Sequence, residues 1–214
     1  FGQSVTFSST VSVTAPGAGT PTGTITFKEG ATTICTGTVA AGTASCSSSA
    51  LSVGAHPVTA TYDGDTNFLA SSASAALTHN VNKANSTAAL VTSGTPSAFG
   101  NSVTFTVTLS ATAPGAGTPG GTVTFLDNSI AIGSCTGVAV SAGVATCTLS
   151  GASALSTGTH PITASYSGDA NFNTSTSDSV SQVVTALATA TALASNLNPS
   201  QSGNSVTFMA TVAS

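Results

Sequence analysis

The chain has 214 residues, only 4% of them charged, and a formal net charge of −4 at pH 7. Its two lysines and no arginine form no basic patch, so we expect no nucleic-acid partner. No apolar run reaches the 18 or more residues that a membrane-spanning helix needs, so we expect no membrane insertion.

The chain opens with a strand-like alternation. Over residues 5–14, valine and phenylalanine alternate with serine and threonine, a period of two that is typical of a strand with one buried face. The PGAGTP segment at 16–21 cannot continue a strand and predicts a turn. A second strand is predicted after this turn, with Ile25 and Phe27 on its inner face.

A predicted hairpin around the turn at 40–42 carries the first two cysteines. Cys35 and Cys46 lie symmetrically about this turn, so we expect them opposite each other in an antiparallel pair, where the Cβ separation suits a disulfide. Cys135 and Cys147 are equally symmetric in a later copy whose loop is one residue longer. The sequence therefore predicts two bridges within hairpins and an oxidising compartment. The alternatives are four buried free cysteines or a metal site, although no Cys-x-x-Cys is present.

An acidic turn follows the next predicted strand. Asp63, Asp65 and Asn67 fall at every second position, the spacing with which short loops wrap calcium. The later copy of this turn has serine in place of the first aspartate, and neither copy has a downstream glutamate. Turn residues that bond the backbone are therefore the competing interpretation, and apart from this calcium hypothesis we expect no metal and no cofactor.

Two other residue pairs are candidate sites. His56 and His160 precede proline at equivalent points, but no nucleophile or paired carboxylate accompanies them, which favours a structural role. No Gly-x-Ser-x-Gly motif is present either, so we do not expect an enzyme. Asn85 and Asn173 begin Asn-x-Ser/Thr triplets and are candidate glycosylation sites.

A long segment recurs along the chain. The block at 1–27 returns almost unchanged at 99–125, and its opening returns again at 202–214. A period of roughly 100 residues indicates a tandem array of small β domains. There is no initiating methionine, signal peptide or anchor, so we expect a processed product or a section of a longer protein.

The patterns FGxSVTF, APGAGTPxGTxTF and GxHPxTAxYxGDxNF resemble the bacterial Ig-like repeat of long, secreted or surface-attached proteins. The resemblance covers the whole chain. It implies an all-β fold of tandem Ig-like β-sandwich domains with Greek-key topology and about seven strands each, in an extracellular or cell-surface protein. Because the cysteines are expected within hairpins, the between-sheet disulfide of antibody domains is not carried over.

The register of the predicted strands divides the array into three units. Residues 1–82 are expected to be an Ig-like domain that lacks its first strand, and residues 83–184 a complete one. Residues 185–214 are expected to hold the first two strands of a further domain.

These observations favour a structural, non-catalytic extracellular repeat that forms a stalk or fibre. A sharper form is assembly into a filament, through strand donation from 186–194 to the open edge of 1–82 or through end-to-end contacts. The partners would then be copies of the chain or neighbouring repeats. The alternative is an adhesin or carbohydrate-binding module for surface glycans, although Tyr62 and Tyr166, the residues that could form a sugar platform, are both in inward register. A third possibility is an accessory domain of a secreted enzyme.

Overall fold

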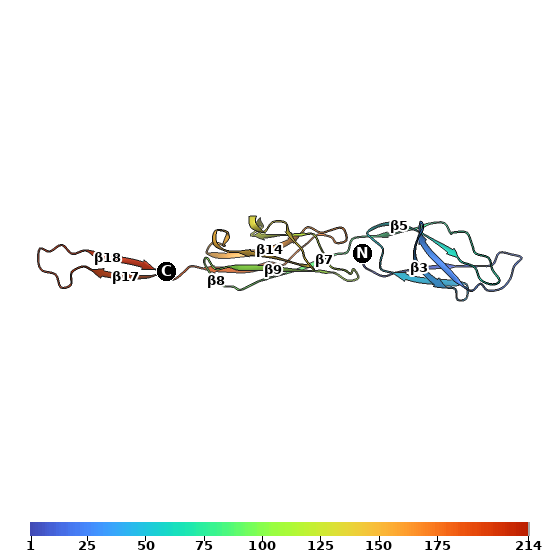
Figure 1. Ribbon diagram of the computed structural model, residues 1–214, viewed down its shortest axis with the longest axis horizontal. Helices are drawn as coiled ribbons and strands as arrows, with labels where there is room; N and C mark the ends of the chain where they lie inside the picture. Colours follow the sequence, from blue (N-terminus) through green and yellow to red (C-terminus); the bar gives the residue numbers. More distant parts are fainter. Residues whose placement is uncertain (214) are drawn as a thin grey trace.

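The computed structural model describes residues 1–213, and Ala152 by its backbone alone. Within this range it contains eighteen strands and two single-turn 3₁₀ helices, so the predicted all-β fold is confirmed. Two β-sandwiches and a hairpin follow one another along a single axis (Figure 1). Among the described residues, no helix has the length and hydrophobicity needed to cross a membrane.

The first sandwich packs a two-stranded sheet against a four-stranded one. The smaller sheet pairs β1 (Val5–Thr10) with β4 (Thr43–Ser48), and the larger has the order β3 (Thr32–Thr38), β2 (Thr24–Glu29), β5 (Gly54–Tyr62) and β6 (Leu77–Val81). Alternating apolar side chains of both sheets, among them Phe7, Ile25, Phe27 and Val58, form the core between them.

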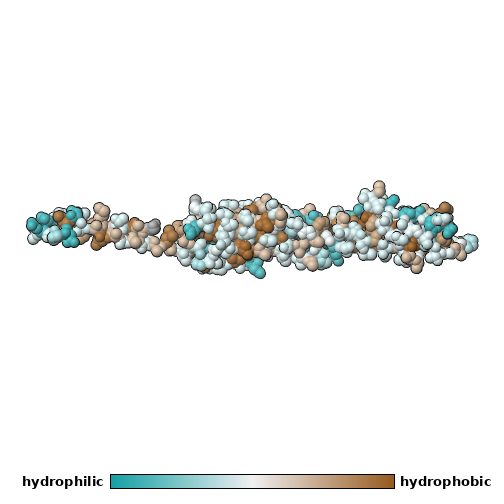
Figure 2. Space-filling model, turned by 60° about the horizontal axis from the view of Figure 1, so that its bottom comes forward, coloured by the Kyte–Doolittle hydropathy of each residue, from teal (hydrophilic) through white to brown (hydrophobic). Residues whose placement is uncertain are grey.

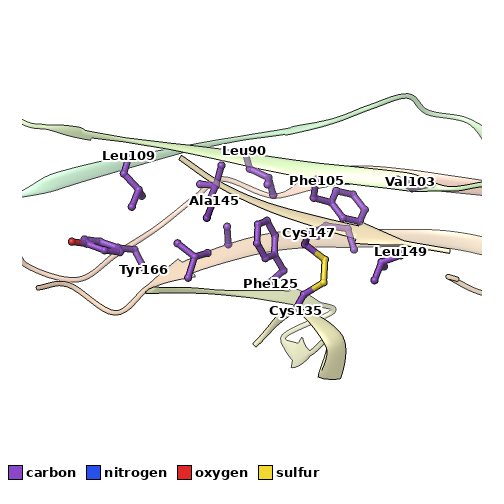
Figure 3. Close-up of a cluster of buried hydrophobic side chains, with 14 of the residues drawn as sticks. Leu90, Val103, Phe105, Leu109, Phe125, Cys135, Ala145, Cys147, Leu149 and Tyr166 are labelled. Carbon is purple, nitrogen blue, oxygen red and sulfur yellow. A yellow bond between two sulfur atoms is a disulfide. The ribbon is translucent and has the colours of Figure 1, made fainter. Parts of the chain in front are cut away.

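The second sandwich has more strands and a larger hydrophobic core than the first. One sheet has the order β13 (Val144–Leu149), β9 (Val103–Ala111) and β7 (Ser86–Thr92). The other has the order β11 (Ile130–Ala131), β10 (Thr122–Asp127), β14 (Gly158–Tyr166), β16 (Val180–Thr185) and β8 (Ser97–Ala98), with β12 (Val138–Ala139) on β10 and β15 (Ser175–Thr176) on β14. Phe105 and Phe125 are fully buried in the core between the sheets (Figure 3). The chain passes between the sheets after β7, β8, β9, β12 and β13, and this order of strands is the predicted Ig-like sandwich.

The two sandwiches differ at one edge. In the second, β7 pairs with β9 along the edge opposite β13. In the first, β1 is the counterpart of β9 and pairs with β4 alone among the described residues. The edge of β1 that faces away from β4 is therefore open. The division into units at 1–82, 83–184 and 185–214, with a first strand missing from 1–82, stays a prediction.

The C-terminal hairpin presents an uncovered apolar face. Its strands β17 (Ala190–Ser195) and β18 (Phe208–Ala213) pair as β7 and β9 do, with Leu193 opposite Ala210 as Leu90 is opposite Val107. Leu193 is 70% exposed, whereas the equivalent Leu90 is 9% exposed, because no second sheet covers the hairpin. Brown apolar atoms are visible along this narrow end of the molecule (Figure 2).

The predicted cysteine hairpins are wrong, although the predicted pairs are present. β3 and β4 belong to different sheets, and the one β-bridge pairing across the turn within the described residues is the isolated bridge between Ala40 and Thr43. β3 pairs instead with β2, and β4 pairs with β1, so the chain crosses between the sheets at the turn. In the second sandwich the strand before the turn is broken into β11, the helix η1 (Gly133–Cys135) and β12.

Candidate functional site

The two disulfides join the sheets of each sandwich. Cys35 on β3 is bonded to Cys46 on β4, with 6.0 Å between their Cα atoms. Cys135 at the end of η1 is bonded to Cys147 on β13, with 5.6 Å between the Cα atoms. Each sulfur pair therefore closes one side of a sandwich, contrary to our expectation that no between-sheet bridge would occur. The described chain has no free cysteine.

The disulfides differ in their surroundings. Cys35 and Cys46 are half-buried, beside the rings of Phe7 and Phe27, whose centroids are 6.1 Å apart. Cys135 and Cys147 are each 2% exposed, so the second bridge is part of the core (Figure 3).

The aspartates of the acidic turns form hydrogen bonds that link neighbouring loops. Asp65 accepts hydrogen bonds from the backbone amides of Asn67 and Phe68 at 2.7 and 2.8 Å. Its other carboxylate oxygen accepts from the amide and the hydroxyl of Thr22 at 2.8 and 2.7 Å. The hydroxyl and amide of Thr22 hold the pKa of the Asp65 carboxyl well below its usual range. Asp63 accepts from the hydroxyls of two β2 threonines, so both carboxylates already have partners.

The second repeat has the same hydrogen-bonded turn, with Asp169 in the place of Asp65 and Ser167 in the place of Asp63. Asp169 accepts from the amides of Asn171, Phe172 and Gly120 at 2.7, 2.8 and 2.7 Å. Burial raises the pKa of Asp169, but these backbone amides more than offset burial and leave the pKa lowered. Among residues 1–213, no three His, Cys, Asp or Glu side chains gather as metal ligands. The arrangement of Asp63, Asp65 and Asn67 therefore supports the turn interpretation over the calcium hypothesis.

The equivalent histidines of the two repeats each lie against two hydrogen-bond acceptors. The Nδ1 of His56 is 2.8 Å from a Glu29 carboxylate oxygen and its Nε2 is 2.9 Å from the Ser52 carbonyl oxygen. The bonds to Glu29 and Ser52 raise the pKa of His56 against the opposing effect of burial. His160 makes the same contacts with Asp127 and the Ser156 carbonyl. Both histidines therefore link the start of a long strand to a carboxylate and to a backbone carbonyl.

The two candidate glycosylation sites lie side by side. Asn85 and Asn173 are both exposed, and the Asn173 side-chain amide donates to the Asn85 side-chain oxygen at 2.9 Å. The hydroxyls of Ser86 and Ser175 are 2.8 Å apart next to them. The sequence cannot indicate this contact, because the two asparagines are 88 residues apart.

The tyrosines lie in the core and offer no sugar platform. Tyr62 is 4% exposed and Tyr166 is 1% exposed. Neither hydroxyl has a hydrogen-bond partner among the described residues. Burial, and next the nearby Asp169 carboxylate, raise the pKa of Tyr166 to about 12.

The junction between the sandwiches joins segments that are far apart in the sequence. The Phe1 ring meets the Phe172 ring edge to face, with centroids 5.9 Å apart and an interplanar angle of 77°. The Phe1 amino group donates to the Asn82 carbonyl at 2.6 Å. A Cβ at Gly117 would lie 3.3 Å from the Phe1 ring and 3.4 Å from the Phe172 ring, so glycine lets both rings approach the loop after β9.

The linker at this junction is bonded to the second sandwich. Ala84 is buried, donates to the Asn171 carbonyl at 2.9 Å and accepts from the Asn173 amide at 2.9 Å. The Lys83 ammonium donates to the Asp169 carbonyl at 2.5 Å. A hollow of about 410 Å³ beside the linker is lined by residues of both sandwiches. Nothing in the sequence predicts this junction directly, although the APGAGTP loop that takes part in it is identical in the two copies.

The comparisons with known proteins concern both sandwiches. The family model described as bacterial Ig-like domain (group 3) matches residues 1–82 and 90–185. A search of curated proteins finds no match.

Three solved structures are similar to the chain. The fibronectin(III)-like modules of CbhA from Clostridium thermocellum are 22% identical over 86% of this chain and 87% of that chain, with a TM-score of 0.37. The titin domains Z1Z2, solved in complex with telethonin, are 14% identical over 87% and 90% of the two chains, with a TM-score of 0.39. A DUF3823 family protein from Bacteroides ovatus is 11% identical over 84% and 98%, with a TM-score of 0.30.

Proposed function

The chain belongs to the bacterial Ig-like domain (group 3) family, and on that premise we propose that it is a structural, non-catalytic section of a secreted or surface-attached stalk or fibre. The observation that carries this proposal is the bonded junction between two sandwiches that lie in line (Figure 1). A linker that is hydrogen-bonded on both sides limits the bending of one sandwich against the other.

The chemistry of the chain suits an extracellular location. Two between-sheet disulfides require an oxidising compartment to form and persist. With two lysines and no arginine, the chain offers few sites to proteases that cut after basic residues. Members of this family are generally non-catalytic. The histidine and aspartate side chains of this chain agree with that, because they form hydrogen bonds with backbone groups.

We extend the proposal to the assembly of copies into a filament. The open edge of β1 and the exposed ends of both sandwiches support this extension, because uncovered edges and apolar groups favour association between chains. The low charge, 4% of the residues, leaves little electrostatic repulsion between copies.

Three measurements test the stalk function. Immunogold electron microscopy of the source cells should place the chain on the surface or in external fibres. Small-angle scattering of the purified chain should show a rod, and intact mass before and after reduction and alkylation should show two disulfides. An intracellular label together with four free thiols would overturn the proposal. Binding of the purified chain on a glycan array would indicate the adhesin function instead.

A further inference from the structure

We propose that the disulfide between Cys35 and Cys46 is a site of thiol–disulfide exchange, which a dithiol reductant opens while the first sandwich stays folded. The disulfide between Cys135 and Cys147 does not react with the same reagent until the second sandwich unfolds. This inference goes beyond the proposed stalk function and does not depend on it, because it compares the chemistry of one repeat with that of the other.

The two disulfides differ in the access that they give to a reagent. Cys35 and Cys46 are both half-buried, whereas Cys135 and Cys147 are each 2% exposed. Exchange requires a thiolate to reach a sulfur atom of the disulfide, so the rate of exchange depends on access. A disulfide within the core is reached only after local or global unfolding, which makes its reduction slow.

The difference in access begins with the length of the segment before the first cysteine of each pair. The chain is two residues longer between Phe125 and Cys135 than between Phe27 and Cys35. The longer segment forms the helix η1, which ends at the buried Cys135, whereas Cys35 lies on the extended strand β3. The first repeat therefore lacks the helix on which Cys135 is buried.

The first disulfide lies along one side of the sandwich, where both sheets end. Within the described residues β3 pairs with β2 alone and β4 pairs with β1 alone, so β3 and β4 are the outer strands of their sheets. The open edge of β1 is on the other side of the same sheet. In the second sandwich β7 covers that edge by pairing with β9 and not with β13. A strand added to β1 would therefore leave β4 and its disulfide uncovered.

A hollow beside the first disulfide gives a small reagent room to approach. The hollow has a volume of about 280 Å³ and lies between the start of β3 and the end of β4. Its lining includes Ile34, which precedes Cys35, and Ser48, which is two residues after Cys46. A reagent that enters this hollow therefore meets residues next to both cysteines.

The exchange transfers two electrons in two steps. A thiolate of the dithiol attacks one sulfur of the disulfide, a mixed disulfide forms, and the bond between the Cys35 and Cys46 sulfurs breaks. The cysteine that is released takes a proton from water. The second thiol of the reagent, as its thiolate, then attacks the mixed disulfide, releases the other cysteine and leaves the reagent oxidised to a disulfide. The first sandwich thereby loses the covalent link between β3 and β4, and each of these strands keeps its own sheet partner.

The test exposes the folded wild-type chain to dithiothreitol and compares both disulfides in one sample. Iodoacetamide traps the released thiols at intervals, and after unfolding and full reduction a heavy-isotope form of the same reagent labels the remaining cysteines. Trypsin then cuts after Lys28 and Lys83, the two basic residues of the chain. The first cysteine pair lies in the peptide 29–83 and the second in the peptide 84–214, so mass spectrometry gives a separate rate for each disulfide.

We expect the first disulfide to be reduced at least tenfold faster than the second in the folded chain. In concentrated guanidinium chloride the two rates should agree within twofold, because the sequence separations of 11 and 12 residues are nearly equal. After reduction, hydrogen exchange should rise in β3 and β4 and stay unchanged in β13. Equal rates in the folded chain, or faster reduction of the second disulfide, would overturn the proposal.

Urea below the unfolding transition separates reaction in the folded state from reaction after unfolding. The rate at the first disulfide should stay constant over this range, because a reaction of the folded state exposes little new surface. A rate that rises in parallel with the hydrogen exchange of β5 would overturn the proposal, since the disulfide would then react only in unfolded chains. A surface-located rod whose disulfides both resist dithiothreitol would overturn this inference and leave the stalk function standing.

Discussion

In each repeat one aspartate carboxylate joins the turn that precedes Phe68 or Phe172 to the loop after the first long strand. In the second repeat Asp169 does this with three backbone amides, and in the first repeat Asp65 does it with three amides and a hydroxyl. The tie supports the junction, because the same turn carries Phe172 and the carbonyl that Lys83 contacts.

We predict that Asp169→Ala destabilises the second sandwich by about 1–3 kcal/mol, because three amides lose a charged acceptor. Hydrogen exchange of residues 158–172 measures the effect. Asp178→Ala is the control, since its exposed side chain makes no hydrogen bond within the described chain. An equal loss of protection in both variants would contradict a stabilising role for the hydrogen bonds of Asp169. Because the pKa of Asp169 is lowered on folding, its contribution is present above the ordinary carboxyl pKa and is lost as the pH falls through the folded value.

We predict a pH dependence of the first sandwich that comes from His56. Both ring nitrogens face acceptors, and the carbonyl and carboxylate can only accept, so the imidazolium satisfies both. Because folding raises the pKa of His56, its contribution is complete below the unfolded pKa of about 6.5 and is lost as the pH rises through the folded value.

Hydrogen exchange of residues 54–62 at pH 5.5 and pH 8.0 checks this dependence. His56→Gln should remove it, with a loss of about 1 kcal/mol at the lower pH. His79→Gln is the control, because His79 packs on the Phe7 ring and has no carboxylate partner among the described residues. A wild-type chain with the same protection at both pH values would contradict the prediction.

At the scale of elements, each disulfide stabilises the packing of two small sheets against each other. Each bridge fixes the crossing between sheets, and the sequence separations of 11 and 12 residues are nearly equal. The chain-entropy contribution is therefore nearly equal too, about 3 kcal/mol for each bridge. The bridges differ in burial, because only the second lies within the core.

We predict that replacing Cys135 and Cys147 by alanine costs more stability than replacing Cys35 and Cys46. Both pairs lose the entropic contribution of about 3 kcal/mol, and the buried pair also leaves a cavity. Urea unfolding followed by hydrogen exchange in each sandwich gives the two losses separately. A larger loss in the first sandwich would contradict the role of burial.

At the scale of the whole molecule, the junction sets how far the array bends. Phe1, the linker at Ala84 and the loop at Gly117 make it a packed contact. Domains without such a contact move independently, which is the usual behaviour of small inter-domain interfaces.

We predict that Phe1→Ser loosens the junction without unfolding either sandwich. Loss of a half-buried phenylalanine removes about 1–2 kcal/mol of apolar contact. Residual dipolar couplings measure the effect, since the two sandwiches should share one alignment tensor in wild type and have different tensors in the variant. Phe99→Ser, at the far end of the second sandwich, should leave the shared tensor unchanged. Different tensors already in wild type would show that the junction is not rigid.

Several features of this protein were predictable because they are local. Alternation of apolar and hydroxyl residues with a period of two indicated strands such as β9, whose Val103, Phe105, Val107 and Leu109 are all buried. Recurrence of the same motifs indicated a tandem array, and symmetric spacing indicated the two cysteine pairs. Each of these inferences depends on neighbours within one or two strands.

Only the tertiary structure decided which sheet each strand joins. The turn at 40–42 has the composition of a hairpin, but β3 pairs with β2 and β4 pairs with β1, so the disulfide joins two sheets. The contact of Asn85 with Asn173 and that of Phe1 with Phe172 join residues far apart in the sequence. Such contacts depend on how complete sandwiches are oriented, and a pattern of neighbouring residues does not contain that orientation.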